Sequence, residues 1–332
     1  MKFEFLKEPI LITGCNGFIG NYFLKYLVNI VDNSEELKNK ADVIAIDNGI
    51  TSSNKIIKRN YIKYFDENLI GFDFGRLKPI KTIFHMAGLA SPAQYKKYPL
   101  ETIDVATNVT RRLLEKSKEW DAKFIFFSSS EIYGNPDKEN IPTKESYKGY
   151  VACQGPRACY DESKRMGEAL CYVYNKYFNV HVNIIRPFNI YGPGMSKQDY
   201  RMMPNLMRAA IEKNKIQIYG DGNQTRTFCY IKDAIKAIYL IAEKGGFGET
   251  YNIGRMEPEI SMKNLVKQFN ISTKNNVEIE LVEYPENYPK DEPLRRCPDV
   301  SKINIHLGYE SEVSLDEGIK LTWDWASEKY SD

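Results

Sequence analysis

The sequence predicts an α/β fold in which a doubly wound parallel sheet is joined to a smaller C-terminal lobe. Short apolar segments alternate with longer amphipathic ones through the first half of the chain, which is typical of strands and crossover helices. The first apolar segment runs directly into the glycine-rich turn Gly14-Cys-Asn-Gly17-Phe-Ile-Gly20. After Arg186-Pro187 the alternation stops, and Gly and Pro cluster at 190–194.

The strands of the sheet are expected where short apolar runs lie between polar, Gly or Pro residues. In chain order these runs are 9–13, 42–47, 61–65, 81–87, 123–129 and 181–186. Apolar residues recur at helical spacing in 18–31, 100–118 and 157–178, so helices are expected there. In the second half we expect helices at 201–213 and 231–243 and strands at 216–219 and 250–253, followed by a mixed region at 258–332.

Composition excludes several classes of protein. The 46 Lys and Arg residues nearly balance the 44 Asp and Glu residues, and no charged block suggests a nucleic-acid surface. No apolar run approaches the length of a membrane span, and the charged N-terminus does not resemble a signal peptide. The six cysteines form no CxxC pair and there are only three histidines, so we expect no metal site and a reducing, cytoplasmic location.

The glycine-rich turn predicts a dinucleotide site. Backbone amides at such a turn, together with the N-terminal dipole of the following helix, hold a pyrophosphate. The second strand ends in Asp47, whose carboxylate would accept hydrogen bonds from the adenosine ribose and repel a 2′-phosphate, which favours NAD over NADP. The residues expected to contact the cofactor are Gly14, Asn16, Gly17, Phe18, Ile19, Gly20, Asp47, Asn48, Asp73, Phe74, Ala87, Tyr160 and Lys164.

Tyr160 and Lys164 form the second informative pattern. They lie four residues apart in an expected helix, so their side chains share one face. A nearby ammonium favours the phenolate, so Tyr160 could act as a base near neutral pH. Together with a dinucleotide site, this pair indicates an enzyme that oxidises an alcohol. The alternatives are a glycine turn with only a structural role and a Tyr–Lys pair that merely lies on the helix surface.

The spacing of the glycines, with Tyr-x-x-x-Lys far downstream, resembles the extended short-chain dehydrogenase/reductase superfamily and, within it, the nucleotide-sugar enzymes. Segments 84–91, 127–134, 186–193 and 219–228 support the resemblance, which extends from residue 9 to residue 319. It implies an NAD-binding Rossmann domain at 1–187, to which 230–253 returns, and a nucleotide-sugar-binding lobe at 188–229 and 254–332. It also implies a homodimer formed through the helices at 100–118 and 157–178.

Three motifs are similar to those of the UDP-glucuronate decarboxylases, or UDP-xylose synthases. They are Ser-Pro-Ala-Gln-Tyr95, Gly-Pro-Arg-Ala-Cys-Tyr160-Asp-Glu-Ser-Lys164-Arg, and Arg-Arg296-Cys-Pro-Asp. The last departs from the Lys-Arg-Lys-Pro-Asp of those enzymes at two positions but keeps the central arginine. The substrate-binding residues that the resemblance implies are Tyr95, Asn189, Gln217, Tyr219, Arg226 and Arg296.

Ser130 and Glu131 help to choose among the reactions that the resemblance allows. The 4,6-dehydratases typically have Asp-Glu here, and serine is a much weaker acid; the 4-epimerases generally lack the glutamate. GDP-mannose 4,6-dehydratases also show Ser-Glu but lack the Gly-Pro-Arg run. Decarboxylation of UDP-glucuronate to UDP-xylose is therefore favoured. A dehydratase or 4-epimerase acting on another nucleotide sugar, and a non-catalytic NAD-binding protein, remain as alternatives.

In the implied mechanism, Tyr160 accepts the proton of the sugar C4 hydroxyl while NAD⁺ accepts the hydride. The resulting 4-ketone is β to the C5 carboxylate, so CO₂ leaves readily, and hydrogen bonds from Tyr160 and Ser129 stabilise the enolate. Ser130 or Glu131 guides reprotonation at C5 before the hydride returns. Lys164 is expected to contact the nicotinamide ribose and to lower the pKa of Tyr160.

Overall fold

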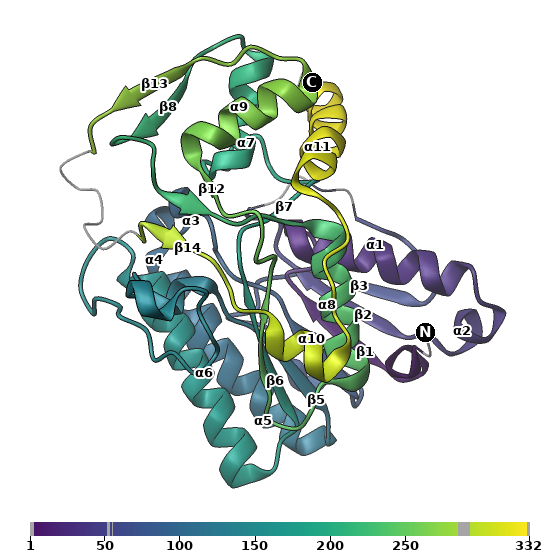
Figure 1. Cartoon of the computed structure of the whole chain (residues 1–332). Helices are drawn as coiled ribbons and strands as arrows, with labels where there is room; N and C mark the ends of the chain where they lie inside the picture. The colour runs from purple at the N-terminus through teal and green to yellow at the C-terminus, as the bar shows by residue number, and fades with distance from the viewer. Residues whose placement is uncertain (1–2, 52–53, 55, 285–292, 331–332) are drawn as a thin grey trace.

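The computed structural model describes residues 3–51, 54, 56–284 and 293–330. At its centre is a seven-stranded sheet of order β11-β6-β5-β4-β1-β2-β3, in which every neighbouring pair is parallel (Figure 1). The strands are β1 (Ile10–Thr13), β2 (Val43–Asp47), β3 (Ile62–Asp66), β4 (Thr82–His85), β5 (Lys123–Phe127), β6 (Val182–Pro187) and β11 (Thr250–Ile253). The predicted doubly wound fold is confirmed.

Two strands end earlier than the sequence suggests. β4 ends at His85 and β5 at Phe127, whereas apolar runs predicted 81–87 and 123–129. Met86 and Ser128 still donate their amides to the neighbouring strands, to Thr13 O at 3.2 Å and to Ile185 O at 2.8 Å. The chain then leaves the sheet at its carboxyl edge, where it is available to line a site.

Helices cover both faces of the sheet. α1 (Phe18–Asp32) and α8 (Ile231–Lys244) pack together on one face, and α5 (Thr110–Trp120) and α6 (Ala158–Phe178) cover the other (Figure 1). Successive residues of a strand point to opposite faces. Accordingly Ile10 and Ile12 join the core cluster of α1 and α8, whereas Leu11 joins the cluster of α5 and α6.

The expected helix at 100–118 is divided into three parts. These are α4 (Pro99–Asp104), the π-helical turn η3 (Val105–Val109) and α5. The carbonyl of Val105 accepts from the ring of His85 at 3.2 Å and from Thr110 Oγ1 at 3.3 Å. Side chains therefore satisfy this carbonyl where the regular helical pattern is interrupted.

The shorter elements complete the first half and build the second lobe, which lies at the top of Figure 1 above the carboxyl edge of the sheet. The short elements in the first half of the chain are η1 (Glu4–Lys7), α2 (Glu35–Lys40), η2 (Phe74–Arg76), α3 (Pro92–Lys97), η4 (Ser130–Tyr133) and η5 (Lys138–Asn140). The helices of the second lobe are α7 (Met202–Ile211), α9 (Met262–Thr273) and α11 (Leu315–Lys329), whereas α10 (Ser301–Leu307) lies lower in Figure 1 and packs against α8 and β11. The small sheets pair β7 (Ile190–Tyr191) with β10 (Cys229–Tyr230), β8 (Ile216–Tyr219) with β13 (Ile279–Val282), and β9 (Thr225–Arg226) with β12 (Ile260–Ser261) and β14 (Arg295–Arg296).

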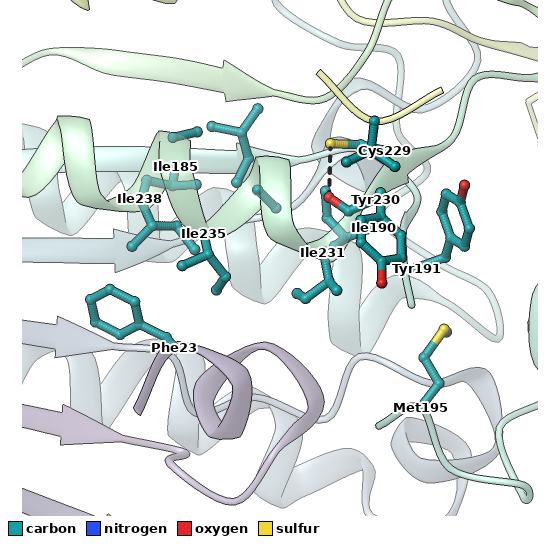
Figure 2. Packing of buried hydrophobic residues seen from close by; sticks show 14 of the residues in the cluster. Phe23, Ile185, Ile190, Tyr191, Met195, Cys229, Tyr230, Ile231, Ile235 and Ile238 are labelled. Atoms are coloured by element: carbon teal, nitrogen blue, oxygen red, sulfur yellow. Dashed lines mark hydrogen bonds between the residues drawn. The ribbon is translucent and has the colours of Figure 1, made fainter. Parts of the chain in front are cut away.

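One apolar cluster joins the two lobes. Figure 2 shows Phe23 of α1, Ile185 of β6 and Ile235 of α8 in the same packed region as Tyr191 and Met195. The cluster continues to α7, α9 and α11. Because dense apolar packing resists displacement, this shared core holds the second lobe in a fixed position over the sheet. The division of the chain into domains stays a prediction.

Over the described ranges, no helix is both long and apolar enough to cross a bilayer. Within the same ranges, no group of three or more His, Cys, Asp or Glu side chains is arranged to hold a metal ion.

Candidate active site

A cavity of about 460 Å³ opens between the carboxyl edge of the sheet and the second lobe. The strand order reverses between β1 and β4, and open parallel sheets bind ligands outside the strand ends at such a point. All the predicted catalytic and substrate residues line this cavity, namely Tyr95, Ser129, Ser130, Glu131, Tyr160, Lys164, Asn189, Gln217, Tyr219, Arg226 and Arg296.

The glycine-rich turn between β1 and α1 leaves no room for side chains. A Cβ on Gly14, whose φ is +71°, would lie 2.6 Å from the backbone of Ala87. A Cβ on Gly20 would lie 2.1 Å from Gly14 O. α1 begins at Phe18 with no side-chain cap on Gly17, so the first amides of the helix are available to an anion.

Asp47 ends β2 beside this turn. Its Oδ2 accepts from Asn16 N at 2.9 Å, and its Oδ1 accepts from Gly49 N at 2.8 Å. These bonds orient the carboxylate, and each oxygen keeps a further lone pair for a ribose hydroxyl. The turn and the carboxylate therefore fit a dinucleotide with a free 2′-hydroxyl.

The other predicted cofactor residues are less directly placed. Asp73 Oδ1 accepts from Gly75 N at 2.8 Å, and the side chain of Phe74 is buried in the core cluster of α5 and α6. Their contact with the cofactor stays a prediction, as does that of Asn48, whose Oδ1 accepts from Ile50 N at 3.2 Å. Strand register places Asp66, which belongs to none of the sequence motifs, directly beside Asp47.

α6 places Tyr160 and Lys164 against the sheet, and both are buried. Lys164 Nζ donates to Phe127 O at 2.6 Å and lies 6.0 Å from the centre of the Tyr160 ring. Burial lowers the pKa of Lys164 to about 8 because an ammonium loses solvation there. The lysine is therefore positioned by the end of β5 next to the phenol.

The pKa of Tyr160 is raised, mainly by burial, because desolvation disfavours the phenolate. A hydrogen bond with the Ser129 side chain is the largest effect that lowers it, and the positive charges of Arg201 and Arg157 lower it further. The sequence predicted that Lys164 would lower this pKa. The largest lowering effects come instead from Ser129, Arg201 and Arg157, and the net shift is upward. The sequence assigned no role to Arg157 or Arg201, because their approach to the phenol depends on the folding of distant segments.

Tyr95 packs against the same phenol. Its ring stacks on that of Tyr160, with centres 5.5 Å apart and planes at 17°, and the side chain is buried. The contact orients the Tyr160 ring. A direct contact of Tyr95 with substrate stays a prediction.

Glu131 lies between two arginines. Its Oε1 is 2.7 Å from Arg296 Nη1, and its Oε2 accepts from Arg296 Nη2 at 2.9 Å. Arg157 also pairs with Glu131, and its Nε donates to Asp161 at 3.2 Å. β14 thus carries Arg296 to the catalytic side of the cavity, where the two parallel bonds fix the geometry of the carboxylate.

The second lobe supplies the remaining polar groups. Tyr219 stacks with Tyr284, with ring centres 5.7 Å apart, and Gln217 Nε2 donates to Glu280 at 2.9 Å. The other predicted side chains here donate to backbone carbonyls, Asn189 to Thr227 O at 2.8 Å and Arg226 to Thr225 O at 2.9 Å. Arg201 lines the same space and pairs with Asp199 at 2.9 Å.

The cavity is strongly cationic. Of the described residues that line it, six are basic and one, Glu131, is acidic. The basic residues are Lys96, Arg157, Lys164, Arg201, Arg226 and Arg296. A concave site with this excess of positive charge favours a ligand that carries several negative charges.

The sequence pattern of the NAD dependent epimerase/dehydratase family matches residues 10–254. The chain belongs to this family. It is 35% identical over 322 residues to UDP-glucuronic acid decarboxylase 6 of Arabidopsis thaliana, covering 96% of this chain and 89% of that protein. It is 32% identical over 322 residues to UDP-glucuronic acid decarboxylase 1 of Xenopus tropicalis, covering 95% of this chain and 71% of that protein.

Two solved structures of the family resemble the fold closely. UDP-glucuronic acid 4-epimerase from Bacillus cereus, in complex with UDP-glucuronic acid and NAD, gives a TM-score of 0.80 at 26% identity, over 96% of this chain and 99% of that one. UDP-glucose 4-epimerase from Thermotoga maritima, with UDP-glucose, gives 0.83 at 26% identity, over 97% and 99%. The predicted membership of an NAD-dependent nucleotide-sugar epimerase/dehydratase family and the predicted cofactor, NAD, are confirmed.

Proposed function

We propose that this chain is a UDP-glucuronate decarboxylase that forms UDP-xylose. The observation that carries the proposal is the placement of Tyr160 in one cationic cavity with the paired Glu131 and Arg296. The curated decarboxylases that match nearly the whole chain support it. A nucleotide hexose, whose sugar carries no carboxylate, would bring less negative charge to this cavity.

The cavity offers a separate group for each part of the substrate. Arg201 and Arg226 suit the diphosphate, because a guanidinium binds anionic oxygens with two parallel hydrogen bonds. Tyr219 and Gln217 offer a ring face and an amide to uracil. The carboxylate of the sugar would then lie near Arg296, at the end of the cavity that also holds Tyr160.

Bound NAD would supply a two-electron acceptor that takes the hydride from C4 and later returns it to the same carbon. Tyr160 accepts the C4 hydroxyl proton, and Ser129, which lines the same cavity and lowers the pKa of this phenol, contacts the same sugar oxygen. The 4-ketone lies β to the carboxylate, so the C5–C6 bond breaks, CO₂ leaves and its bonding electrons form an enolate. Donors at the enolate oxygen, Tyr160 and Ser129, stabilise that charge.

Two steps then restore a pentose. Ser130 or Glu131 directs a proton to C5, either directly or through water. Tyr160 returns its proton to the C4 oxygen when this carbon is reduced. Arg296 keeps Glu131 oriented toward the cavity throughout, because both carboxylate oxygens lie against its guanidinium.

A second candidate follows from the Bacillus cereus structure, which holds UDP-glucuronic acid but is a 4-epimerase. An epimerase would use Tyr160 in the same way and retain the carboxylate. The higher identity to the decarboxylase of Arabidopsis thaliana, 35% against 26% for the epimerase, favours loss of CO₂. The dehydratase and the non-catalytic binding protein are the remaining rivals.

Incubation of the purified chain with NAD⁺ and either UDP-glucuronate or UDP-glucose, followed by proton NMR, tests the proposal. We expect a UDP-pentose from the first and no product from the second. A site built around a carboxylate can reject the analogue lacking it by about 10⁴-fold. UDP-galacturonate, a 4-keto-6-deoxy sugar from the hexose, or no turnover would each support one of the rivals and contradict decarboxylation.

A further inference from the structure

Asn16 is the most extensively anchored residue of the glycine-rich turn. Its amide N donates to Asp47 Oδ2 at 2.9 Å, and its carbonyl accepts from Asn54 Nδ2 at 2.9 Å. Its side-chain Nδ2 donates to the hydroxyl of Tyr64 at 2.7 Å, and the residue is only 6% exposed. One residue therefore ties the turn to the end of β2, to the following loop and to β3.

Tyr64 belongs to none of the sequence motifs. It lies on β3, two residues before the strand ends beside Asp47. Its ring packs against the core cluster of α1, on the same side of the sheet as the turn. Burial, with the nearby charge of Asp47, raises the pKa of Tyr64 to about 12, so a neutral hydroxyl faces Asn16 at physiological pH.

We propose that Tyr64 is a positioning residue for NAD, acting through Asn16. The bond to Asn16 Nδ2 fixes the side chain of a residue whose backbone amide is directed at Asp47. The pyrophosphate-binding turn and the ribose-binding carboxylate are thereby held in one arrangement before the dinucleotide arrives. Groups that are ordered in advance lose less conformational entropy on binding, which increases affinity.

The hydroxyl of Tyr64 can be removed without changing the ring. In Tyr64→Phe, calorimetry on the full chain freed of nucleotide should show a Kd for NAD⁺ about 3–10-fold above the wild-type value, the usual size of one net hydrogen bond. Tyr61→Phe is the matched control. Tyr61 lies in the same segment and its hydroxyl also bonds a side chain, donating to Asp32 Oδ1 at 2.6 Å, but it does not touch the turn. The Kd of Tyr61→Phe for NAD⁺ should equal the wild-type value.

A double-mutant cycle tests whether the effect passes through Asn16. Asn16→Ala should weaken NAD⁺ binding, and adding Tyr64→Phe should weaken it no further, because residues that share one interaction are not additive. Thermal unfolding of each variant checks that the fold is retained. Wild-type affinity in Tyr64→Phe, equal weakening in Tyr61→Phe, or additive effects in the double variant would each overturn the proposal.

Discussion

At the residue scale, the proposed reaction depends on the phenol of Tyr160. Tyr160→Phe keeps the stacked ring and removes the hydroxyl that exchanges the C4 proton. Turnover should fall by about 10²–10⁴-fold, the usual contribution of a positioned acid–base group, with NAD⁺ affinity nearly intact. NMR measures the rate of turnover, and calorimetry measures the affinity for NAD⁺.

Tyr98→Phe serves as the control for this change. Tyr98 packs against the same small cluster of Leu89, Tyr95 and Tyr160, yet it is not among the residues that line the cavity. The control should turn over at the wild-type rate. Wild-type turnover in Tyr160→Phe itself would remove the phenol from the mechanism.

His85 shows a different consequence of burial. Its Nε2 lies 3.2 Å from the carbonyl of Val105, which can only accept, so Nε2 carries the proton and Nδ1 accepts from Thr13 Oγ1 at 2.8 Å. Burial lowers the pKa of His85 to about 3. Both ring nitrogens of this fully buried histidine are therefore hydrogen-bonded.

This histidine makes stability depend on pH. An unfolded histidine binds a proton near pH 6.5, whereas the folded one stays neutral to about pH 3. The stabilisation is therefore present above pH 6.5 and is lost as pH falls. Between pH 7.5 and pH 5 the wild type should lose about 2 kcal/mol more of its free energy of unfolding than His85→Gln, whose amide can make both hydrogen bonds. Urea titrations at the two pH values measure this, and equal losses would contradict it.

At the scale of elements, local patterns predicted the glycine-rich turn and the Tyr160–Lys164 face of α6 because each is encoded within one short segment. The pairing of Glu131 with Arg157 and Arg296 could not be predicted this way. It joins the end of β5, the start of α6 and the two-residue strand β14, and only the folded chain brings them together. The π-helical turn was also missed, since the apolar spacing at 100–118 continues through it.

The packing of α6 gives a prediction at this scale. A Cβ on Gly167 would lie 2.4 Å from Phe126 Cζ and 2.8 Å from the carbonyl of Ala106. Gly167→Ala should therefore lower the free energy of unfolding by about 1–3 kcal/mol through overpacking, although alanine favours a helix by about 1 kcal/mol.

Gly71→Ala is the matched control, because nothing lies within 4 Å of the added Cβ and its backbone is not left-handed. It should change the free energy of unfolding by less than about 0.5 kcal/mol. Urea unfolding of both variants measures these changes in the free energy of unfolding. Wild-type stability in Gly167→Ala would show that α6 can move away from β5 at little cost.

At the scale of the whole molecule, periodic patterns were sufficient to predict the sheet, while the cavity depends on a core shared by both lobes. Several apolar side chains lie outside this core and are exposed on the adjacent helices α4 and α6. They include Leu100, Ile103, Met166, Val173 and Tyr177. An exposed apolar surface of this kind is typical of an interface. We therefore propose that two copies associate through these helices.

Sedimentation should give twice the 38.4 kDa mass of the chain. The double change Val173→Lys and Tyr177→Lys should shift the protein toward monomer, because it places charge in the proposed interface. Ile305→Lys, which changes an exposed isoleucine on α10, should leave the mass unchanged. A wild-type monomer at micromolar concentration would contradict the interface.

The fate of the sugar carboxyl carbon tests the central claim, decarboxylation, most directly. The full chain is incubated with NAD⁺ and UDP-glucuronate labelled with ¹³C at C6, and ¹³C NMR follows both CO₂ and the nucleotide sugar, with Tyr160→Phe in parallel. We predict one labelled CO₂ for each UDP-pentose formed, with both products from the variant appearing about 10²–10⁴-fold more slowly. Labelled UDP-galacturonate, formed without release of CO₂, would contradict the account and assign an epimerase.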